Sequence, residues 1–413
     1  MRFVCVFLCL CGCTNKAGPP SSASKARLPA RIVIGATLPV STAEGQTARF
    51  YREGYELAVE EANRAGGVNV SGRRIPVVLE FLDDAGDPSG AAAQIRTLVD
   101  EKKASFLLGS ASGAVVEAQS ALAEGRRIPY VTAAGESKAR FERGLKYFFG
   151  LQAPVQLLAY TQMRWIDEQQ KARRLPTPLS VAVLVEDSQR GYEFAAGVRD
   201  FVAKTPSRRA SYRIVFDAAF PPSQQDFSQL LQRVRDARAD VFLADATLSE
   251  FLTLHRRYLW LGLCHKVISY GAHGGETLAL EEFGFRGLSY ILSAVWWSAR
   301  LAKRGLNKQF ADEFKETYHR DPDWYGALAY EAGRALLAAI ASSGDAKSDS
   351  VRTQLATMKM ESILPGGRLL FGPDQQAIYP FVVQQNQPDG SSPVIFPNDV
   401  AESPGVPVNP RCH

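Results

Sequence analysis

Short apolar runs recur along the first half of the chain, and polar stretches with helical spacing lie between them. The runs are 32–36, 76–81, 105–109 and 129–133. Each run is apolar on both faces, which is typical of a strand buried inside a parallel sheet. Apolar positions spaced three to four apart predict helices over 47–65, 89–102 and 112–124. This alternation predicts an α/β fold with a parallel sheet covered by helices on both faces.

The same alternation begins again near residue 181, which predicts a second α/β half. Strands are expected over 181–185, 213–216, 241–244 and 267–270, with helices over 191–204, 227–238 and 248–261. Gly150 to Pro154 is the nearest candidate for a link between the halves. Further helices are expected over 307–318 and 325–341. The final pattern predicts a hairpin of 368–371 with 381–384 around Gly372-Pro373-Asp374, followed by a loose, Pro-rich end.

The N-terminus has the pattern of an export signal. Arg2 precedes an apolar run from Phe3 to Cys11, which is shorter than the roughly 20 residues that span a bilayer. Four of the six cysteines lie within the first thirteen residues. The polar stretch 15–25 suits a tether that holds a domain away from a membrane. A cytosolic chain with a buried N-terminal strand is the alternative.

Composition and charge narrow the class further. The chain has 413 residues and a net charge of +5, and its basic pairs are scattered rather than gathered, so no nucleic-acid partner is expected. The length without a signal segment, about 400 residues, suffices for two domains. Cys264 and Cys412 remain outside the N-terminal group. In an oxidising compartment they could pair, or Cys264 could be buried and Cys412 carried by a loose tail, and their spacing does not decide.

The motifs of common enzymes are missing. Gly109-Ser110-Ala111-Ser112-Gly113 has Ala where a nucleophile elbow has Ser, and it lacks the Gly-Lys that ends a P-loop. The five histidines are far apart and no paired-cysteine motif occurs, so neither a metal nor a cofactor is expected. A strand that ends in this Gly/Ser turn offers backbone N–H groups and the Ser112 hydroxyl to a carboxylate. Plain helix capping by Ser110 or Ser112 is the alternative.

Several segments together resemble a known family. They are YELAVEEANRAGGV, FLDDAGDPSGAAAQIRTLVDEKKASFLLGSASGA, IPYVTAAGES, WYGALAYEAGRALLAAI and GGRLLFGPDQQAIYPFVVQQ. Their order and spacing resemble the type I periplasmic solute-binding proteins, in particular the branched-chain (leucine/isoleucine/valine-type) amino-acid group, from about Arg31 to Pro397. Leu10-Cys11-Gly12-Cys13 resembles the lipobox of bacterial lipoproteins. That resemblance implies a signal peptide over 1–12, a lipid anchor on Cys13 and a tether over 13–30.

The resemblance also implies the architecture. Two Rossmann-like lobes with parallel central sheets would be joined by a hinge of three crossovers. The first lobe would comprise 31–151 and 279–362, and the second 152–278 and 363–397, with a loose tail over 398–413. Ligand would lie in the cleft between the lobes, which close over it by a hinge motion.

Candidate ligand-binding residues in the first lobe follow from the family's motifs. Ser112-Gly113 matches the Ser-Gly turn whose hydroxyl holds the ligand α-carboxylate. Ala133 to Glu136 matches the turn that offers a backbone carbonyl and a Thr to the α-amine and carboxylate, which makes Ala133 and Ala134 candidates. Glu136 stands where Thr is usual. It could pair with an ammonium group, or point outward as an acid at a helix start.

Candidates in the second lobe depart further from the family. Arg190 stands where an aromatic residue packs on the ligand, unless it turns to solvent. Asp245 falls at a ligand-contacting position. His273 falls near the family's acidic partner of the amine, with a solvated loop histidine as the alternative. Tyr325 and Trp296-Trp297 could line the cleft or pack in the core.

The resemblance implies a lipid-anchored periplasmic protein that captures amino acids for an ABC importer and does no chemistry. Its partners would be a small-molecule ligand, an inner-membrane permease and the membrane that holds the anchor, and the protein would be a monomer. Small aromatic or aliphatic carboxylates stay open as ligands. Three other roles stay open as well: a ligand sensor for a signalling partner, an exported hydrolase, and a structural lipoprotein with a decayed cleft.

Overall fold

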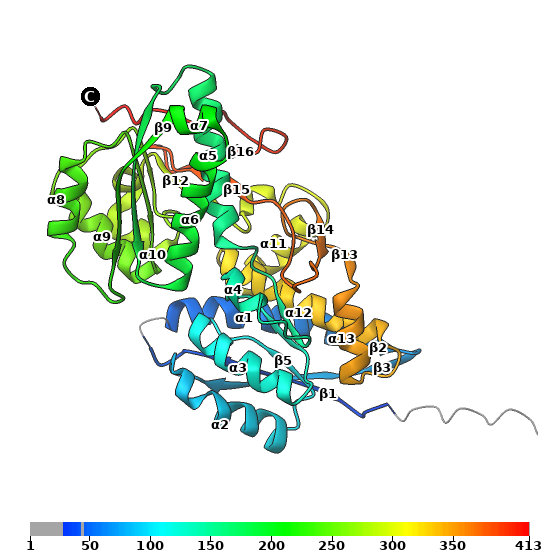
Figure 1. Cartoon of the computed structure of the whole chain (residues 1–413). Helices are drawn as coiled ribbons and strands as arrows, with labels where there is room; N and C mark the ends of the chain where they lie inside the picture. Colours follow the sequence, from blue (N-terminus) through cyan, green and yellow to red (C-terminus); the bar gives the residue numbers. More distant parts are fainter. Residues whose placement is uncertain (1–27, 43–44, 413) are drawn as a thin grey trace, which may run out of the picture.

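The computed structural model describes residues 28–42 and 45–412 (Figure 1). Cys13, the expected signal peptide and most of the expected tether therefore lie outside the described residues. Within the described ranges, no helix combines the length and the apolar character needed to cross a bilayer.

The first lobe is built on a five-stranded sheet in the order β4-β1-β5-β6-β7, with every pair parallel. The strands are β1 Ile32–Leu38, β4 Val77–Asp83, β5 Phe106–Leu108, β6 Tyr130–Thr132 and β7 Phe148–Gly150. All seven residues of β1 are buried, as its apolar faces predict. The helices α1 Gly45–Arg64, α2 Ala91–Arg96 and α3 Gly113–Gly125 follow the strands. Short helical turns, η1 Pro88–Gly90 and η2 Thr97–Glu101, flank α2.

Helices from the later part of the chain complete this lobe. They are α11 Gly305–Tyr318, α12 Trp324–Ser342 and α13 Ser348–Ala356, with the turn η3 Ala299–Leu301 and the strand pair β13 Lys359–Glu361 with β14 Arg368–Leu370. The lobe also contains the short helix α4 Lys138–Phe141 and the strand pair β2 Val68–Val70 with β3 Arg73–Ile75. The helices α1 and α12 pack closely through small residues. A Cβ atom on Gly54 would lie 2.3 Å from the Gly326 carbonyl oxygen, so this crossing requires glycine.

The second lobe has a seven-stranded sheet in the order β16-β15-β12-β11-β10-β8-β9. The strands are β8 Leu179–Glu186, β9 Tyr212–Phe220, β10 Val241–Asp245, β11 Val267–Ser269, β12 Ile291–Val295, β15 Val382–Gln385 and β16 Val394–Phe396. The helices are α5 Val155–Lys171, α6 Gln189–Ala203, α7 Pro206–Ser211, α8 Ser228–Asp236, α9 Leu248–Trp260 and α10 Thr277–Leu288. Strands β8 to β12 pair in parallel, whereas β15 and β16 are antiparallel. The expected class, two α/β lobes with parallel central sheets, is confirmed.

The chain passes between the lobes three times, but two passages fall later than expected. Strand β12 pairs with β11 and β15, so the second lobe continues through Val295 rather than ending at 278. The stretch after 363 first packs on the first lobe, where Gln376 bridges to Gly150 and the Phe371 ring lies 5.3 Å from that of Phe149. The third passage therefore lies between this contact and β15, not at 363 (Figure 1).

The expected hairpin of 368–371 with 381–384 is not formed. Strand β14 pairs with β13 in the first lobe, and β15 pairs with β12 in the second. A single bridge between Phe371 and Ala377 closes the Gly372 turn, after which the chain leaves for the other lobe. Each strand contains two adjacent apolar residues, and so short a pattern does not reveal which partner each strand takes.

The C-terminal segment is packed rather than loose. Its Glu402 pairs with Arg300 and Lys303, and the Asn409 N–H donates to the Lys266 carbonyl. Cys264 and Cys412 form a disulfide, which decides between the two alternatives left open by the sequence. The expected loose tail over 398–413 is thus corrected for residues 398–412, because hydrogen bonds and the disulfide hold them to the second lobe and the Glu402 ion pairs hold them to the segment around η3.

Candidate functional site

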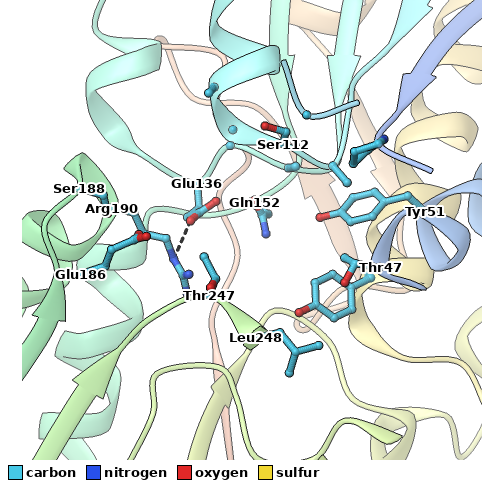
Figure 2. A pocket seen from close by; sticks show the side chains of 18 of the residues that line it. Thr47, Tyr51, Ser112, Glu136, Gln152, Glu186, Ser188, Arg190, Thr247 and Leu248 are labelled. Atoms are coloured by element: carbon cyan, nitrogen blue, oxygen red, sulfur yellow. Dashed lines mark ion pairs between the residues drawn. The ribbon is translucent and has the colours of Figure 1, made fainter. Parts of the chain in front are cut away.

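A cleft of about 580 Å³ lies between the lobes. It is lined by loops that follow β5, β6, β8 and β10, so the carboxyl ends of both sheets face it, as is usual for ligand sites in parallel α/β proteins (Figure 2). Among the predicted site residues, those that line the cleft are Ser112, Gly113, Ala134, Glu136, Arg190, His273 and Tyr325. Two do not line it. Asp245 pairs with Arg190, and the buried Ala133 accepts a 3.5 Å hydrogen bond from the Tyr51 hydroxyl through its carbonyl.

The Ser112 hydroxyl is available in one corner of the cleft. Helix α3 begins at Gly113, and Ser112 stands at its N-cap in an extended conformation without capping through its side chain. Instead its N–H donates to the Ser110 hydroxyl oxygen at 3.0 Å. Within the part of the chain that the structure describes, the Ser112 hydroxyl makes no hydrogen bond, so the capping alternative for this side chain is not observed.

Arg190 joins the two lobes across the cleft. Its Nε lies 2.7 Å from the Glu136 Oε1 of the first lobe, a contact that lacks the alignment of a hydrogen bond (Figure 2). Its Nη2 donates to Asp245 Oδ1 and its Nη1 to the Ala246 carbonyl, both at 2.9 Å. The side chain is 19% exposed, so Arg190 does not turn to solvent. Glu136 likewise does not point outward, because it faces Arg190.

The carboxylates around Arg190 are buried to different degrees. Asp245 is 1% exposed, and burial raises its pKa to about 6 although Arg190 favours the ionised form. Glu186 also lines the cleft, and burial together with the nearby Glu250 raises its pKa. Three acids therefore surround one arginine, which leaves this wall of the cleft rich in negative charge.

His273 is buried rather than solvated. Its Nε2 lies 3.0 Å from the Ala246 carbonyl oxygen and its Nδ1 lies 2.6 Å from Glu276 Oε1. Both partners are acceptors, so both hydrogen bonds form only when the ring carries two protons. Burial by itself would raise the pKa of Glu276, but the His273 charge and hydrogen bond outweigh burial and lower it. The loop histidine of the alternative is thus buried between Glu276 and the Ala246 carbonyl.

Aromatic side chains form the opposite wall. The Trp324 and Tyr325 rings stack at 3.6 Å, Tyr51 lies 5.8 Å from Tyr325, and Trp296 lies 4.8 Å from Trp324. The Tyr51 hydroxyl and the Glu136 carboxylate reach into the same space from opposite sides (Figure 2). Tyr325 and Trp296 therefore line the cleft while also packing in the core, whereas Trp297 packs against Phe310.

Several lining residues escaped the sequence prediction. They include Thr47, Tyr51, Arg140, Gln152, Glu186, Ser188, Thr247, Leu248 and Trp324. Gln152 lies in the first passage between the lobes, and its buried Oε1 has no hydrogen-bond partner among residues 28–42 and 45–412. The turn after β8 gave a usable signal for Glu186 and Ser188, because Arg190 of the same turn was already predicted to lie at the cleft. Arg140 gave none, because its place depends on how α4 folds back.

A second set of contacts joins the lobes beside the cleft. Glu193 of α6 accepts hydrogen bonds from the Ser137 hydroxyl at 2.8 Å, the Lys138 N–H at 2.9 Å and the Ala139 N–H at 3.2 Å. These donors belong to the first lobe and Glu193 belongs to the second, so the three hydrogen bonds hold the two lobes together beside the cleft. Among the described residues, no group of three or more metal-ligating side chains occurs.

Two α/β lobes, three connecting passages and a polar cleft between them define a two-lobed ligand-binding protein. The chain belongs to the periplasmic binding protein family, whose model matches residues 31–391. The Leu/Ile/Val-binding protein homolog 8 of Brucella abortus is 22% identical over 382 residues, covering 90% of this chain and 92% of the relative.

Two solved structures share the fold. The branched-chain amino-acid transporter substrate-binding protein LivJ of Streptococcus pneumoniae, in complex with isoleucine, has a TM-score of 0.75 and 20% identity and covers 89% of this chain and 100% of its own. An ABC transporter solute-binding protein from R. palustris, in complex with benzoate, has a TM-score of 0.73 and 18% identity and covers 92% of this chain and 96% of its own.

Proposed function

We propose that this protein captures an amino acid outside the cytoplasm and delivers it to an ABC importer. The observation that carries the proposal is a donor and an acceptor that the described part of the chain leaves unused within one interlobe cleft. The Ser112 hydroxyl suits a carboxylate, and the buried Gln152 Oε1 suits an ammonium group. The Gln376 amide donates to the backbone carbonyls of Glu136 and Gln152, and both of these residues line the cleft.

The remaining parts of the proposal follow from the family and the N-terminal sequence. The lobes close over the ligand, and the closed form is presented to a permease in the inner membrane. The protein acts as a monomer in the periplasm, is held to a membrane by lipid on Cys13, and binds without transforming its ligand. The relatives' names support branched-chain or related amino acids as the ligand class.

A carboxylate without an amine is the second candidate ligand. The Glu136 charge is already matched by Arg190, so an ammonium group is not required to neutralise it. The stacked Trp324 and Tyr325 rings offer a flat apolar wall, and the R. palustris protein of the same fold holds benzoate.

Thermal melting of the refolded, ligand-free protein tests the proposal. The panel contains the twenty amino acids and small aromatic and aliphatic carboxylates. A ligand at 100 times its dissociation constant adds about 2.7 kcal/mol to the free energy of unfolding, a readily measured rise in melting temperature. We expect the rise with one group of amino acids and its loss in Ser112→Ala, but not in Ser207→Ala on the exposed face of α7.

Two outcomes revise the proposal. If only carboxylates without an amine raise the melting temperature, and Glu136→Gln leaves that rise unchanged, the second candidate replaces the first. If no compound of the panel raises it, amino-acid capture is rejected.

A further inference from the structure

Arg140 brings a guanidinium group into the Ser112 corner of the cleft. It lies on α4, and its side chain folds back over Gly135 onto Gly113. A Cβ atom on Gly113 would lie 2.9 Å from Arg140 Nη2 and 3.3 Å from Cζ, so the absence of a side chain at 113 makes room for the guanidinium. The Arg140 side chain is 14% exposed and lines the cleft.

The charge of Arg140 is poorly matched by the protein itself. The guanidinium donates no hydrogen bond to the residues that the structure describes, and its Nε is buried without a partner. Its nearest acid is Glu117, whose Oε2 is 3.5 Å away and whose side chain is 55% exposed. An exposed partner at that distance is strongly screened by water.

The position is also unfavourable for a cation. Gly113 is the first residue of the thirteen-residue helix α3, and the N-terminal end of a helix carries a positive partial charge. A guanidinium placed there is repelled by the helix end, and the neighbouring Ser112 hydroxyl is a further unused donor. One corner therefore gathers a full positive charge, a helix N-terminus and a hydroxyl, and an anion satisfies all three.

We propose that Arg140 binds the carboxylate of the ligand, together with the Ser112 hydroxyl, and thereby makes a free carboxylate the required feature of the ligand. The proposal rests on the proposed capture of a small solute in this cleft, but it holds for an amino acid and for a plain carboxylate alike. A guanidinium donates two parallel hydrogen bonds to a carboxylate, a geometry that an amide or ester does not reproduce. Because Ser112 and Arg140 both lie on the first lobe, that lobe alone supplies this carboxylate site.

The test compares Arg140→Gln and Arg140→Lys with Arg143→Gln as the matched control. Arg143 is a neighbouring arginine that bonds within the first lobe to the Glu117 carbonyl and Ser120, and it does not line the cleft. The first readout is the melting temperature without ligand. We expect Arg140→Gln to melt at or above the temperature of Arg143→Gln, because it removes a cation from a helix N-terminus.

The second readout uses L-leucine and benzoate as probes, with L-leucinamide and benzamide as their uncharged-end counterparts. We expect the wild type to bind an acid but not its amide. Arg140→Gln should bind that acid roughly 10- to 100-fold more weakly, and Arg140→Lys should fall between them. Arg143→Gln should bind as the wild type does.

Several results would overturn the proposal: unchanged acid binding by Arg140→Gln, equal binding of an amide, or a ligand-free melting temperature of Arg140→Gln well below that of Arg143→Gln. The last result would mean that Arg140 stabilises the fold. If neither probe binds the wild type, the ligand-free comparison still decides for or against Arg140, while the amino-acid panel decides on the proposed function.

Discussion

Arg190 occupies the place where the resemblance predicts an aromatic ring against the ligand, and it changes what that place does. Asp245 and the Ala246 carbonyl hold the guanidinium on the second lobe by hydrogen bonds, whereas its contact to Glu136 of the first lobe is poorly aligned. The Glu136 carboxylate can therefore give up its contact with Arg190 and bind a ligand group instead, at a small cost in free energy. Asp245, being 1% exposed, has no such freedom.

Replacing Arg190 with Met tests how far the stability of the fold depends on the ion pair between Arg190 and Asp245. Arg190→Met leaves Asp245 buried without its partner and should lower the free energy of unfolding by about 2–3 kcal/mol at pH 7.5. The deficit should shrink as the pH falls towards 6, because loss of Arg190 raises the pKa of Asp245 further and the variant takes up a proton there before the wild type, in which the pKa of Asp245 is about 6. Urea unfolding followed by tryptophan fluorescence measures it. Recovery in Arg190→Met/Asp245→Asn is the control, and a deficit of the same size at pH 5 would contradict the account.

Some individual site residues could be predicted from the sequence, and others were missed for a physical reason. Glu136 follows β6 in the first sheet and Arg190 follows β8 in the second, and the resemblance predicted both at the cleft that the carboxyl ends of the two sheets face. The contact between Glu136 and Arg190 joins the two lobes, so neither sequence segment alone predicts it. Arg140 was missed because the four-residue α4 and the bare Gly113 together decide where its long side chain ends.

Helix α9 carries a buried histidine, His255, which makes the free energy of unfolding depend on pH. His255 accepts from the Tyr270 hydroxyl at Nδ1 and donates to the Gly287 carbonyl at Nε2, which fits the neutral ring. Burial lowers its pKa to about 4, against an ordinary value of 6.5. Between these values the unfolded chain binds a proton that the folded chain does not, so stability falls as pH falls from 6.5 towards 4.

Protonation of His255 in the unfolded chain lowers the free energy of unfolding between pH 7 and pH 4, and we expect His255→Asn to reduce this fall by roughly 2–3 kcal/mol. Urea midpoints across that range, compared with those of the wild type, measure the difference. The comparison is needed because Asp245 acts with the opposite sign: its raised pKa makes the folded state bind the extra proton below about pH 6. Parallel profiles for the two proteins would contradict the burial argument.

Periodicity predicted most helices and parallel strands because each buries its apolar positions against its immediate neighbours. It failed for β14 and β15, which are short and close in sequence, contain two apolar residues each, but belong to different sheets. A turn rich in Gly, Pro and Asp separates them, and such a turn is equally compatible with a hairpin and with a passage between lobes. Only the pairing partners β13 and β12 distinguish the two.

Over the whole molecule, closure depends on contacts between the lobes that no single segment predicts. Glu193 accepts three hydrogen bonds from the first lobe and does not line the cleft. Glu193→Ala should favour the open form, increase the ligand-free radius of gyration in X-ray scattering and weaken ligand binding about tenfold. Asp200→Ala, on the same helix and bonded only to Gln156 of its own lobe, is the control. Equal scattering curves and affinities for the two variants would contradict a closing role.

The disulfide between Cys264 and Cys412 should stabilise the second lobe by holding the C-terminal segment in place. We expect Cys412→Ser to lower the free energy of unfolding by about 2–4 kcal/mol. Reduction of the wild type should have the same effect, and the reductant should not change the variant further. Urea midpoints with and without reductant measure this. A wild-type midpoint that stays unchanged after thiol titration has shown full reduction would contradict it.

Lobe boundaries were the least predictable feature at this scale. The alternation of strands and helices shows that a second half exists. It does not show where the chain returns to the first lobe, because β12 in the second lobe and helix α12, which follows it in the first lobe, are both rich in apolar residues. Gly150 to Pro154 already marked the first passage, whereas the second and third were expected from the resemblance and their positions became clear only from the pairing of strands.

Calorimetric titration with three related compounds tests the central claim most directly. The first is the amino acid that gives the largest rise in melting temperature, the second its amine without the carboxylate, and the third its acid without the amine. The account predicts one saturable site for the amino acid, no binding of the amine, and weaker binding of the acid. Binding of the amine as tightly as the amino acid would contradict the account, because it would show that the Ser112 and Arg140 corner does not hold the ligand.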